Sequence, residues 1–213
     1  MAALEKYIDH TLLKPTASPT AIKKLCAEAM EHQFYAVCVN GCHVQQAKAE
    51  LRNSGVQLAA VIGFPLGANH TKTKIYEAEQ CIQDGADEID MVINVGWLKS
   101  NMDDQVRKEI KAIKNAIQTK VLKVILETCF LTDEEKVRAC QLAMAAGADF
   151  VKTSTGFGSG GATYEDVKLM KGVVGDQVKI KASGGIKTKA MALKYIELGA
   201  SRIGTSSGPL III

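Results

Sequence analysis

The sequence lacks the features that mark membrane, secreted and nucleic-acid-binding proteins. No stretch approaches the roughly 20 consecutive apolar residues of a membrane-spanning helix, and the first residues (MAALEK) hold no apolar signal-peptide core. Basic residues exceed acidic ones by only three and form no run, and aromatic residues make up only 5% of the chain. We therefore expect a cytoplasmic protein that binds neither membranes nor nucleic acids.

Paired metal ligands and a dinucleotide fingerprint are also missing. The six cysteines include no CxxC pair, and the group Cys38, Cys42 and His43 has no second ligand pair at a zinc-site spacing. Gly156-Phe-Gly-Ser-Gly160 resembles a nicotinamide-binding loop but lacks the spacing to a last glycine and a following acidic residue. We expect buried free thiols, no metal and no cofactor.

What the sequence does contain is a regular alternation of short apolar runs and amphipathic stretches, which is typical of parallel strands joined by helices. The expected strands are residues 7–12, 36–39, 58–63, 88–95, 122–127, 150–154, 179–182 and 202–204. The expected helices are residues 19–31, 42–53, 71–84, 103–118, 132–146, 163–172 and 187–198. With 213 residues, this pattern predicts one (β/α)8 TIM barrel domain over residues 1–213, an α/β fold whose last helix is truncated.

An internal repeat supports the barrel. Gly-Ala-Asp at residues 85–87 recurs at 147–149 and returns as Gly-Ala-Ser at 199–201, and the copies are 62 and 52 residues apart. Each copy ends an expected helix, where glycine suits a left-handed conformation, and opens an expected strand. Because each interval holds one further strand, the repeat marks the fourth, sixth and eighth strands of the barrel.

The repeat also predicts which charged residues meet inside the barrel. Asp90, Lys152 and Gly204 each stand five residues beyond a repeat glycine. Alternate strands contribute side chains to common layers, so Asp90 and Lys152 should lie at one height in the interior, where Gly204 leaves space. Buried charges are costly, so these residues need a strong pairing or a chemical role.

Two lysines on neighbouring strands suggest a nucleophilic amine. Lys152 and Lys181 each precede a glycine-containing turn, and mutual repulsion together with burial can leave one amine neutral near pH 7. A neutral amine can attack an aldehyde to form an iminium, and Asp90 could then move protons. Two alternatives stay open: Lys152 and Asp90 form only a salt bridge, or Lys179, which shares the face of Lys181, is the inward lysine.

The chain resembles the deoxyribose-phosphate aldolase family along essentially its whole length. The matching segments are Ile8-Asp-His-Thr-Leu12, Gly85-Ala-Asp-Glu-Ile-Asp-Met91, Lys123-Val-Ile-Leu-Glu-Thr128, Phe150 to Gly156, and Lys181-Ala-Ser-Gly-Gly185. The resemblance implies a class I aldolase that reversibly cleaves 2-deoxy-D-ribose 5-phosphate into acetaldehyde and D-glyceraldehyde 3-phosphate in deoxyribonucleotide catabolism. It also implies that Lys152 forms the Schiff base and that Asp90 and Lys181 assist proton transfer.

Three glycine-containing turns after the last strands form a candidate phosphate site. Barrels of this type commonly bind phosphate there, through backbone amides at turns and helix starts. The candidate phosphate-binding residues are Gly156, Gly184, Gly185, Lys187, Gly204, Ser206 and Ser207. The alternative is that these are tight turns without a ligand.

Two features mark this chain within the resemblance. Phe157 stands where some family members carry a basic residue, and the sequence ends at Ile213, soon after the last strand. The apolar segment at residues 209–213 should pack beneath the barrel or against another subunit of a homo-oligomer. Two other functions remain possible: a phosphosugar isomerase or lyase with Asp90 as base, and an inactive barrel that binds a phosphometabolite.

Overall fold

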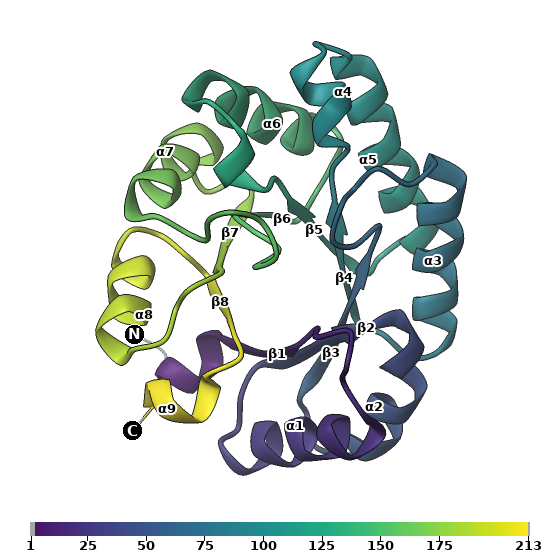
Figure 1. Cartoon of the computed structure of the whole chain (residues 1–213), viewed down its shortest axis with the longest axis vertical. Helices are drawn as coiled ribbons and strands as arrows, with labels where there is room; N and C mark the ends of the chain where they lie inside the picture. Colours follow the sequence, from purple (N-terminus) through teal and green to yellow (C-terminus); the bar gives the residue numbers. More distant parts are fainter. Residues whose placement is uncertain (1–2, 213) are drawn as a thin grey trace.

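Eight parallel strands form a closed barrel in the computed structural model, which describes residues 3–212, and helices surround it (Figure 1). The strands are β1 (Ile8–Leu12), β2 (Ala36–Asn40), β3 (Gln57–Ile62), β4 (Glu88–Val92), β5 (Val121–Ile125), β6 (Phe150–Lys152), β7 (Lys179–Ser183) and β8 (Arg202–Thr205). Each strand pairs with its neighbours in sequence, and β8 pairs with β1 to close the ring. The TIM barrel expected from the sequence is confirmed.

The helices follow the expected pattern closely. They are α1 (Pro19–Glu31), α2 (Val44–Glu50), α3 (Thr71–Gln83), α4 (Val95–Lys99), α5 (Asp103–Ile117), α6 (Asp133–Ala145), α7 (Tyr164–Val174), α8 (Lys189–Glu197) and α9 (Gly208–Ile212), with short 3-10 turns η1 (Leu4–Tyr7), η2 (Gly41–His43) and η3 (Thr128–Phe130). Ser18 caps α1 ahead of Pro19, and Thr132 and Glu135 form the capping box of α6.

The fourth strand is shorter than expected, because it ends at Val92 rather than continuing to residue 95. Asn94 turns the chain into α4 by accepting a hydrogen bond from the backbone N–H of Trp97 through its side chain. The apolar residue Val95 therefore begins a helix. The last helix, α9, has only five residues, as expected for a truncated element.

The repeat has a clear structural reason. Gly85, Gly147 and Gly199 all have positive φ, between 83° and 109°, which a residue with a side chain rarely adopts. The aspartates of the first two copies, Asp87 and Asp149, accept the backbone N–H of Leu58 and Leu122 at the start of the preceding strand. Each copy thus ends one helix and fixes the strand that follows it against its neighbour.

The apolar core lies mainly between the barrel and the helices. A second, small apolar group of Leu13, Cys38, Ala59 and Val61 is separate from this core and involves β2 and β3. The buried charged residues of the barrel lie instead on the other strands, β1 and β4 to β8. The barrel is therefore divided into a small apolar side and a charged side, and the charged side holds the candidate site.

One buried ion pair lies outside the barrel, between α3 and α5. Lys74 Nζ is 2.8 Å from Glu109 Oε2 and donates a second hydrogen bond, of 2.9 Å, to the carbonyl of Val92. Both side chains are almost fully buried. The pair joins two helices to the end of β4 and is independent of the charges inside the barrel.

The C-terminal segment packs only in part. Ile211 is fully buried, Ile212 is partly buried and Leu210 is 70% exposed, whereas Ile213 lies outside the described residues. Helix α9 contacts β1 and η1, so the two ends of the described chain lie side by side (Figure 1). None of the helices in residues 3–212 combines the length and the apolar character needed to cross a membrane.

Candidate active site

Lys152 and Asp90 meet inside the barrel, as the repeat predicts. Lys152 ends β6 and Asp90 is the third residue of β4, and their side chains are 2% and 0% exposed. The distance from Lys152 Nζ to Asp90 Oδ2 is 2.8 Å. The two positions that share an offset from the repeat glycine therefore hold an ion pair in the interior.

Lys181 is the third member of this group, and the register of β7 decides between it and Lys179. Lys181 is fully buried with its Nζ 2.9 Å from Asp90 Oδ2, whereas Lys179 is exposed at the start of the strand. Gly204 leaves space for Lys181, because a Cβ on Gly204 would lie 3.0 Å from Lys181 Cε. The structure therefore places Lys181 rather than Lys179 in the interior, with Gly204 beside it.

Four further charged residues that the sequence analysis did not assign lie on the same side of the barrel. Asp9 on β1 accepts from Lys181 at 2.6 Å and from Arg202 on β8 at 2.5 Å. Lys123 on β5 donates to Asp90 Oδ1 at 2.7 Å and lies 2.5 Å from Glu88 Oε2. Glu88 Oε1 also accepts from Arg202, at 2.6 Å.

Some of these residues carried a signal in the sequence. Glu88 precedes Asp90 by two residues, so strand periodicity places both on the inner face. Lys123 pairs in register with Asp90 on the next strand, but that register cannot be read from the sequence alone. Asp9 and Arg202 lie at opposite ends of the chain and meet only because β8 closes on β1.

The electrostatic surroundings separate the two lysines. Burial lowers the pKa of Lys152, the charge of Lys181 lowers it further, and Asp90 only partly offsets this. Burial acts in the same direction on Lys181, but its contacts with Asp9 and Asp90 more than offset burial, so the pKa of Lys181 is raised. Lys152 is therefore the amine that can become neutral, while Lys181 keeps its proton.

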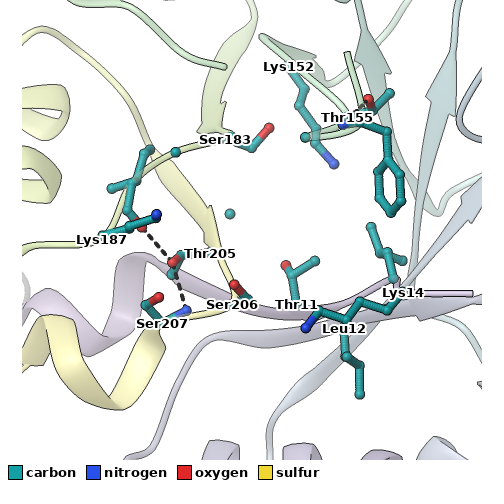
Figure 2. Close-up of a pocket in the computed structure, with 17 residues that line it drawn as sticks. Thr11, Leu12, Lys14, Lys152, Thr155, Ser183, Lys187, Thr205, Ser206 and Ser207 are labelled. Atoms are coloured by element: carbon teal, nitrogen blue, oxygen red, sulfur yellow. Dashed lines mark hydrogen bonds between the residues drawn. The ribbon is translucent and has the colours of Figure 1, made fainter. Parts of the chain in front are cut away.

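Lys152 lines a cavity of about 340 Å³ (Figure 2). All seven candidate phosphate-binding residues line it, together with Lys152. The lining also includes polar residues and a cation that the sequence analysis did not assign, namely Thr11, Lys14, Thr155, Ser183 and Thr205. The turns after β6, β7 and β8 are thus brought to one opening with the Schiff-base candidate.

Hydrogen bonds order two of these turns. The Thr205 hydroxyl donates to the carbonyl of Ile186 at 2.8 Å and accepts the backbone N–H of Ser207 at 2.9 Å (Figure 2). The Ser183 hydroxyl donates to the carbonyl of Ser154 at 2.5 Å. Adjacent turns therefore hold each other in place around the opening, while Gly185, Lys187 and Ser206 stay exposed.

A strained residue supports the turn after Lys152. Glu127 follows β5 with φ of 56°, in the left-handed region that is uncommon for residues with a side chain. Its buried carboxylate accepts the backbone N–H of Thr155 at 3.1 Å and also accepts from the Thr155 hydroxyl. Phe157, two residues further, lines the cavity and packs edge-on against Phe64.

The cysteines are free and differ in exposure. Cys26, Cys38, Cys81 and Cys140 are buried as expected, whereas Cys42 is exposed and Cys129 is half-buried. For the last two the expectation of burial was wrong, because both follow strands rather than facing the core. Among the described residues, no three His, Cys, Asp or Glu side chains are arranged to hold a metal ion.

Comparison with known proteins shows the family of the chain. The model of the DeoC/LacD aldolase family matches residues 4–210. The deoxyribose-phosphate aldolase of Finegoldia magna is 57% identical over 209 residues, covering 98% of both chains. That of Thermotoga maritima is 56% identical over 209 residues, covering 98% of this chain and 84% of the other.

Solved structures give the same picture. An aldolase named QR15 superposes with a TM-score of 0.96 and 44% identity, covering 100% of this chain and 95% of the other. The deoxyribose phosphate aldolase of Aeropyrum pernix, described as a unique tetramer, has a TM-score of 0.90 and 31% identity, covering 98% and 89%. The chain therefore belongs to the DeoC/LacD family of aldolases.

Proposed function

We propose that this protein is a deoxyribose-phosphate aldolase, which reversibly cleaves 2-deoxy-D-ribose 5-phosphate into acetaldehyde and D-glyceraldehyde 3-phosphate. The observation that carries the proposal is the buried Lys152, whose pKa is lowered and whose amine faces a cavity rimmed by glycine-containing turns. The names of the most similar relatives support the same reaction.

In this mechanism Lys152 acts as the nucleophile. Its neutral amine attacks the aldehyde carbon of the open-chain sugar, and loss of water leaves an iminium. The positive nitrogen draws electrons from the bond between C2 and C3, which breaks when the C3 hydroxyl loses its proton. Glyceraldehyde 3-phosphate leaves, and the enamine that stays on Lys152 takes a proton at C2 before water releases acetaldehyde.

Asp90 and Lys181 move the protons in this proposal. Lys181 keeps its proton in the resting site, so it can donate to the enamine directly or through water. Asp90 Oδ2 receives hydrogen bonds from both lysines, and the iminium on Lys152 keeps only one of the hydrogens that the ammonium group carries. The carboxylate lies between the two amines, where it can pass a proton between substrate and Lys181.

The 5-phosphate is held in this proposal by the turns after β6, β7 and β8. Backbone amides at Gly156, Gly184, Gly185 and Gly204 and the hydroxyls of Ser206 and Ser207 supply donors, and Lys187 adds a positive charge. All seven residues line the same cavity as Lys152. This arrangement explains why the turns are short and rich in small residues.

Reductive trapping tests the function. Borohydride with acetaldehyde should add one ethyl group to the intact protein, and peptide mapping should locate it at Lys152. Lys152→Met should abolish trapping and leave the fold intact, and a chelator should not change activity. Labelling at Lys179 or Lys181 instead would refute the assignment, and turnover without any trapped adduct would favour the isomerase alternative.

Self-association and location belong to the same proposal. Leu193 on α8 and Leu210 on α9 are 47% and 70% exposed, and large exposed apolar side chains favour contact with another subunit. We expect a homo-oligomer in the cytoplasm. Light scattering should give a mass above the 22.9 kDa of one chain, and Leu210→Lys should lower it.

A further inference from the structure

Six charged side chains inside the barrel form a closed ring in which acids and bases alternate. Around the ring, each carboxylate contacts the cation on either side of it, and each cation contacts the carboxylate on either side. In order around the ring they are Asp90, Lys123, Glu88, Arg202, Asp9 and Lys181. Lys123 also lies 4.0 Å from Asp9 across the ring. The ring joins β4 and β5 to β7, β8 and β1, and every member is at most 3% exposed.

Lys152 stands outside this ring. Three carboxylates balance three cations within the ring, so its net charge is zero when all six groups are ionised. Lys152 contacts only Asp90, through an oxygen that Lys181 already uses. A proton on Lys152 would therefore add a positive charge that no carboxylate of the ring is left to compensate.

We propose that Glu88 and Arg202 are positioning residues that close this ring and thereby keep Lys152 as the single surplus amine. Neither residue touches Lys152, and Arg202 lies on the far side of the ring from Asp90. The negative charge of Glu88 balances the positive charge of Lys123, which it contacts. Arg202 contacts both Glu88 and Asp9 and places its positive charge between these two carboxylates. This inference rests on the proposed function, because it explains why that particular lysine is available as a nucleophile.

The directions of the pKa shifts agree with this arrangement. Burial lowers the pKa of Lys123, Lys181 and Arg202, but the carboxylates of the ring more than offset burial, so all three are raised. Lys152 is equally buried, yet its pKa is lowered. The four bases differ mainly in the number of carboxylates that each one contacts.

Three charged groups outside the ring lie close to the site: Lys14 and Lys187 line the cavity, and the buried Glu127 carboxylate accepts from Thr155. β2 contributes Cys38, which is fully buried and whose pKa burial raises, and β3 contributes the neutral Ala59 and Val61. Lys179 on β7 is exposed. Among the strands of the barrel, the charges around Lys152 are thus those of Asp90, Lys181 and the rest of the ring.

Aromatic side chains hold Arg202 in place beneath the site. The Tyr35 ring lies 3.3 Å from the guanidinium carbon, and the Phe150 ring lies 5.6 Å away. The planar guanidinium binds the two carboxylates through different nitrogens in a fixed geometry. Arg202 is therefore held by aromatic contacts as well as by ion pairs.

Two neutralising variants should move the reactivity of Lys152 in opposite directions. Glu88→Gln removes a negative charge and should lower the pH midpoint of trapping, while Arg202→Met removes a positive charge and should raise it. A charge roughly 10 Å away, at an effective dielectric constant of about 20, shifts a pKa by about one unit. The double variant E88Q/R202M restores neutrality and should return the midpoint towards that of the unmodified protein.

The readout is the pH dependence of labelling at Lys152, followed by peptide mass spectrometry. Formaldehyde with cyanoborohydride methylates accessible neutral amines, so this measurement does not require aldolase activity. Trapping with acetaldehyde is run in parallel on the unmodified protein. Labelling by formaldehyde without trapping by acetaldehyde would count against the proposed function, and the midpoints of the variants would still test the ring.

Controls separate charge from stability. Glu109→Gln disrupts the buried pair with Lys74 and should lower the melting temperature without moving the midpoint. Arg202→Lys keeps the charge and should restore the midpoint that Arg202→Met displaces. Labelling midpoints that do not change, or that move in the same direction in Glu88→Gln and Arg202→Met, would overturn the proposal. If one variant does not fold, the direction in which the midpoint of the other variant moves decides whether the proposal holds.

Discussion

Removing Lys181 should make Lys152 a weaker nucleophile at neutral pH. The two amines lie 2.8 and 2.9 Å from the same oxygen of Asp90, so they are no more than about 5.7 Å apart. At an effective dielectric constant of about 20, two positive charges at this separation repel by about 3 kcal/mol, which corresponds to about two pKa units. Lys181→Leu removes this repulsion and also leaves Asp9 with one cation fewer.

Both effects favour the protonated form of Lys152, so its pKa should rise. The pH midpoint of acetaldehyde trapping should then move up by about two units, and the neutral fraction of Lys152 near pH 7 should fall by roughly 100-fold. The assay is intact-mass spectrometry after borohydride reduction at a series of pH values, with peptide mapping to confirm the modified residue.

The matched control is Lys179→Leu, which removes an equal charge two residues earlier on β7, where the lysine is exposed. Water screens that charge, so the midpoint should stay within a few tenths of a unit. A midpoint that does not move in Lys181→Leu, or that moves equally in both variants, would show that the two buried amines are not electrostatically coupled.

Three other outcomes are expected. Asp90→Asn should reduce turnover roughly 100-fold or more, because proton transfer is lost, while acetaldehyde is still trapped, because the imine still forms. Unchanged turnover in steady-state kinetics would show that Asp90 has no part in the mechanism. Lys187→Met should lower kcat/KM for the phosphorylated sugar by roughly 10- to 100-fold, which corresponds to the loss of one charge-assisted hydrogen bond. The kcat/KM for unphosphorylated deoxyribose should not change, and Lys189→Met is the control, because Lys189 lies outside the cavity. Burial alone would raise the pKa of Asp9 and Asp90, but the surrounding cations lower the pKa of both carboxyls. Both carboxylates therefore add stability above their unfolded pKa of about 4, and this stability is lost as the pH falls. Urea unfolding should show a free energy of unfolding that decreases below about pH 4, and an increase on acidification would contradict this.

The sequence predicted the elements whose signals are local. The eight strands were found because each is a short apolar run, and the repeat glycines marked where helices end. Asp90 and Lys152 could be paired before the structure was known, since equal offsets from the repeat put them in one layer. Helix α4 was missed because Val95 and its apolar neighbours continue the strand pattern, and the capping role of Asn94 outweighed that pattern.

The charges that surround the site could not be predicted in the same way. Asp9 and Arg202 are separated by 193 residues and meet through the closure of the barrel. The partners of Lys123 depend on the register between β4 and β5, and a shift by one residue would turn its side chain to the other face. Long-range contacts and strand register are properties of the folded barrel, so a reading of local patterns does not contain them.

The contact between Glu127 and Thr155 has a consequence for loop exchange among barrels of this kind. The turn that follows β6 receives part of its support from the loop after β5, through the buried carboxylate of Glu127, whose backbone is left-handed. A graft of residues 153–160 without a threonine at position 155 would leave that buried carboxylate without its hydroxyl donor, at a cost of about 1–3 kcal/mol. The transferable module is therefore a pair of neighbouring loops rather than a single one.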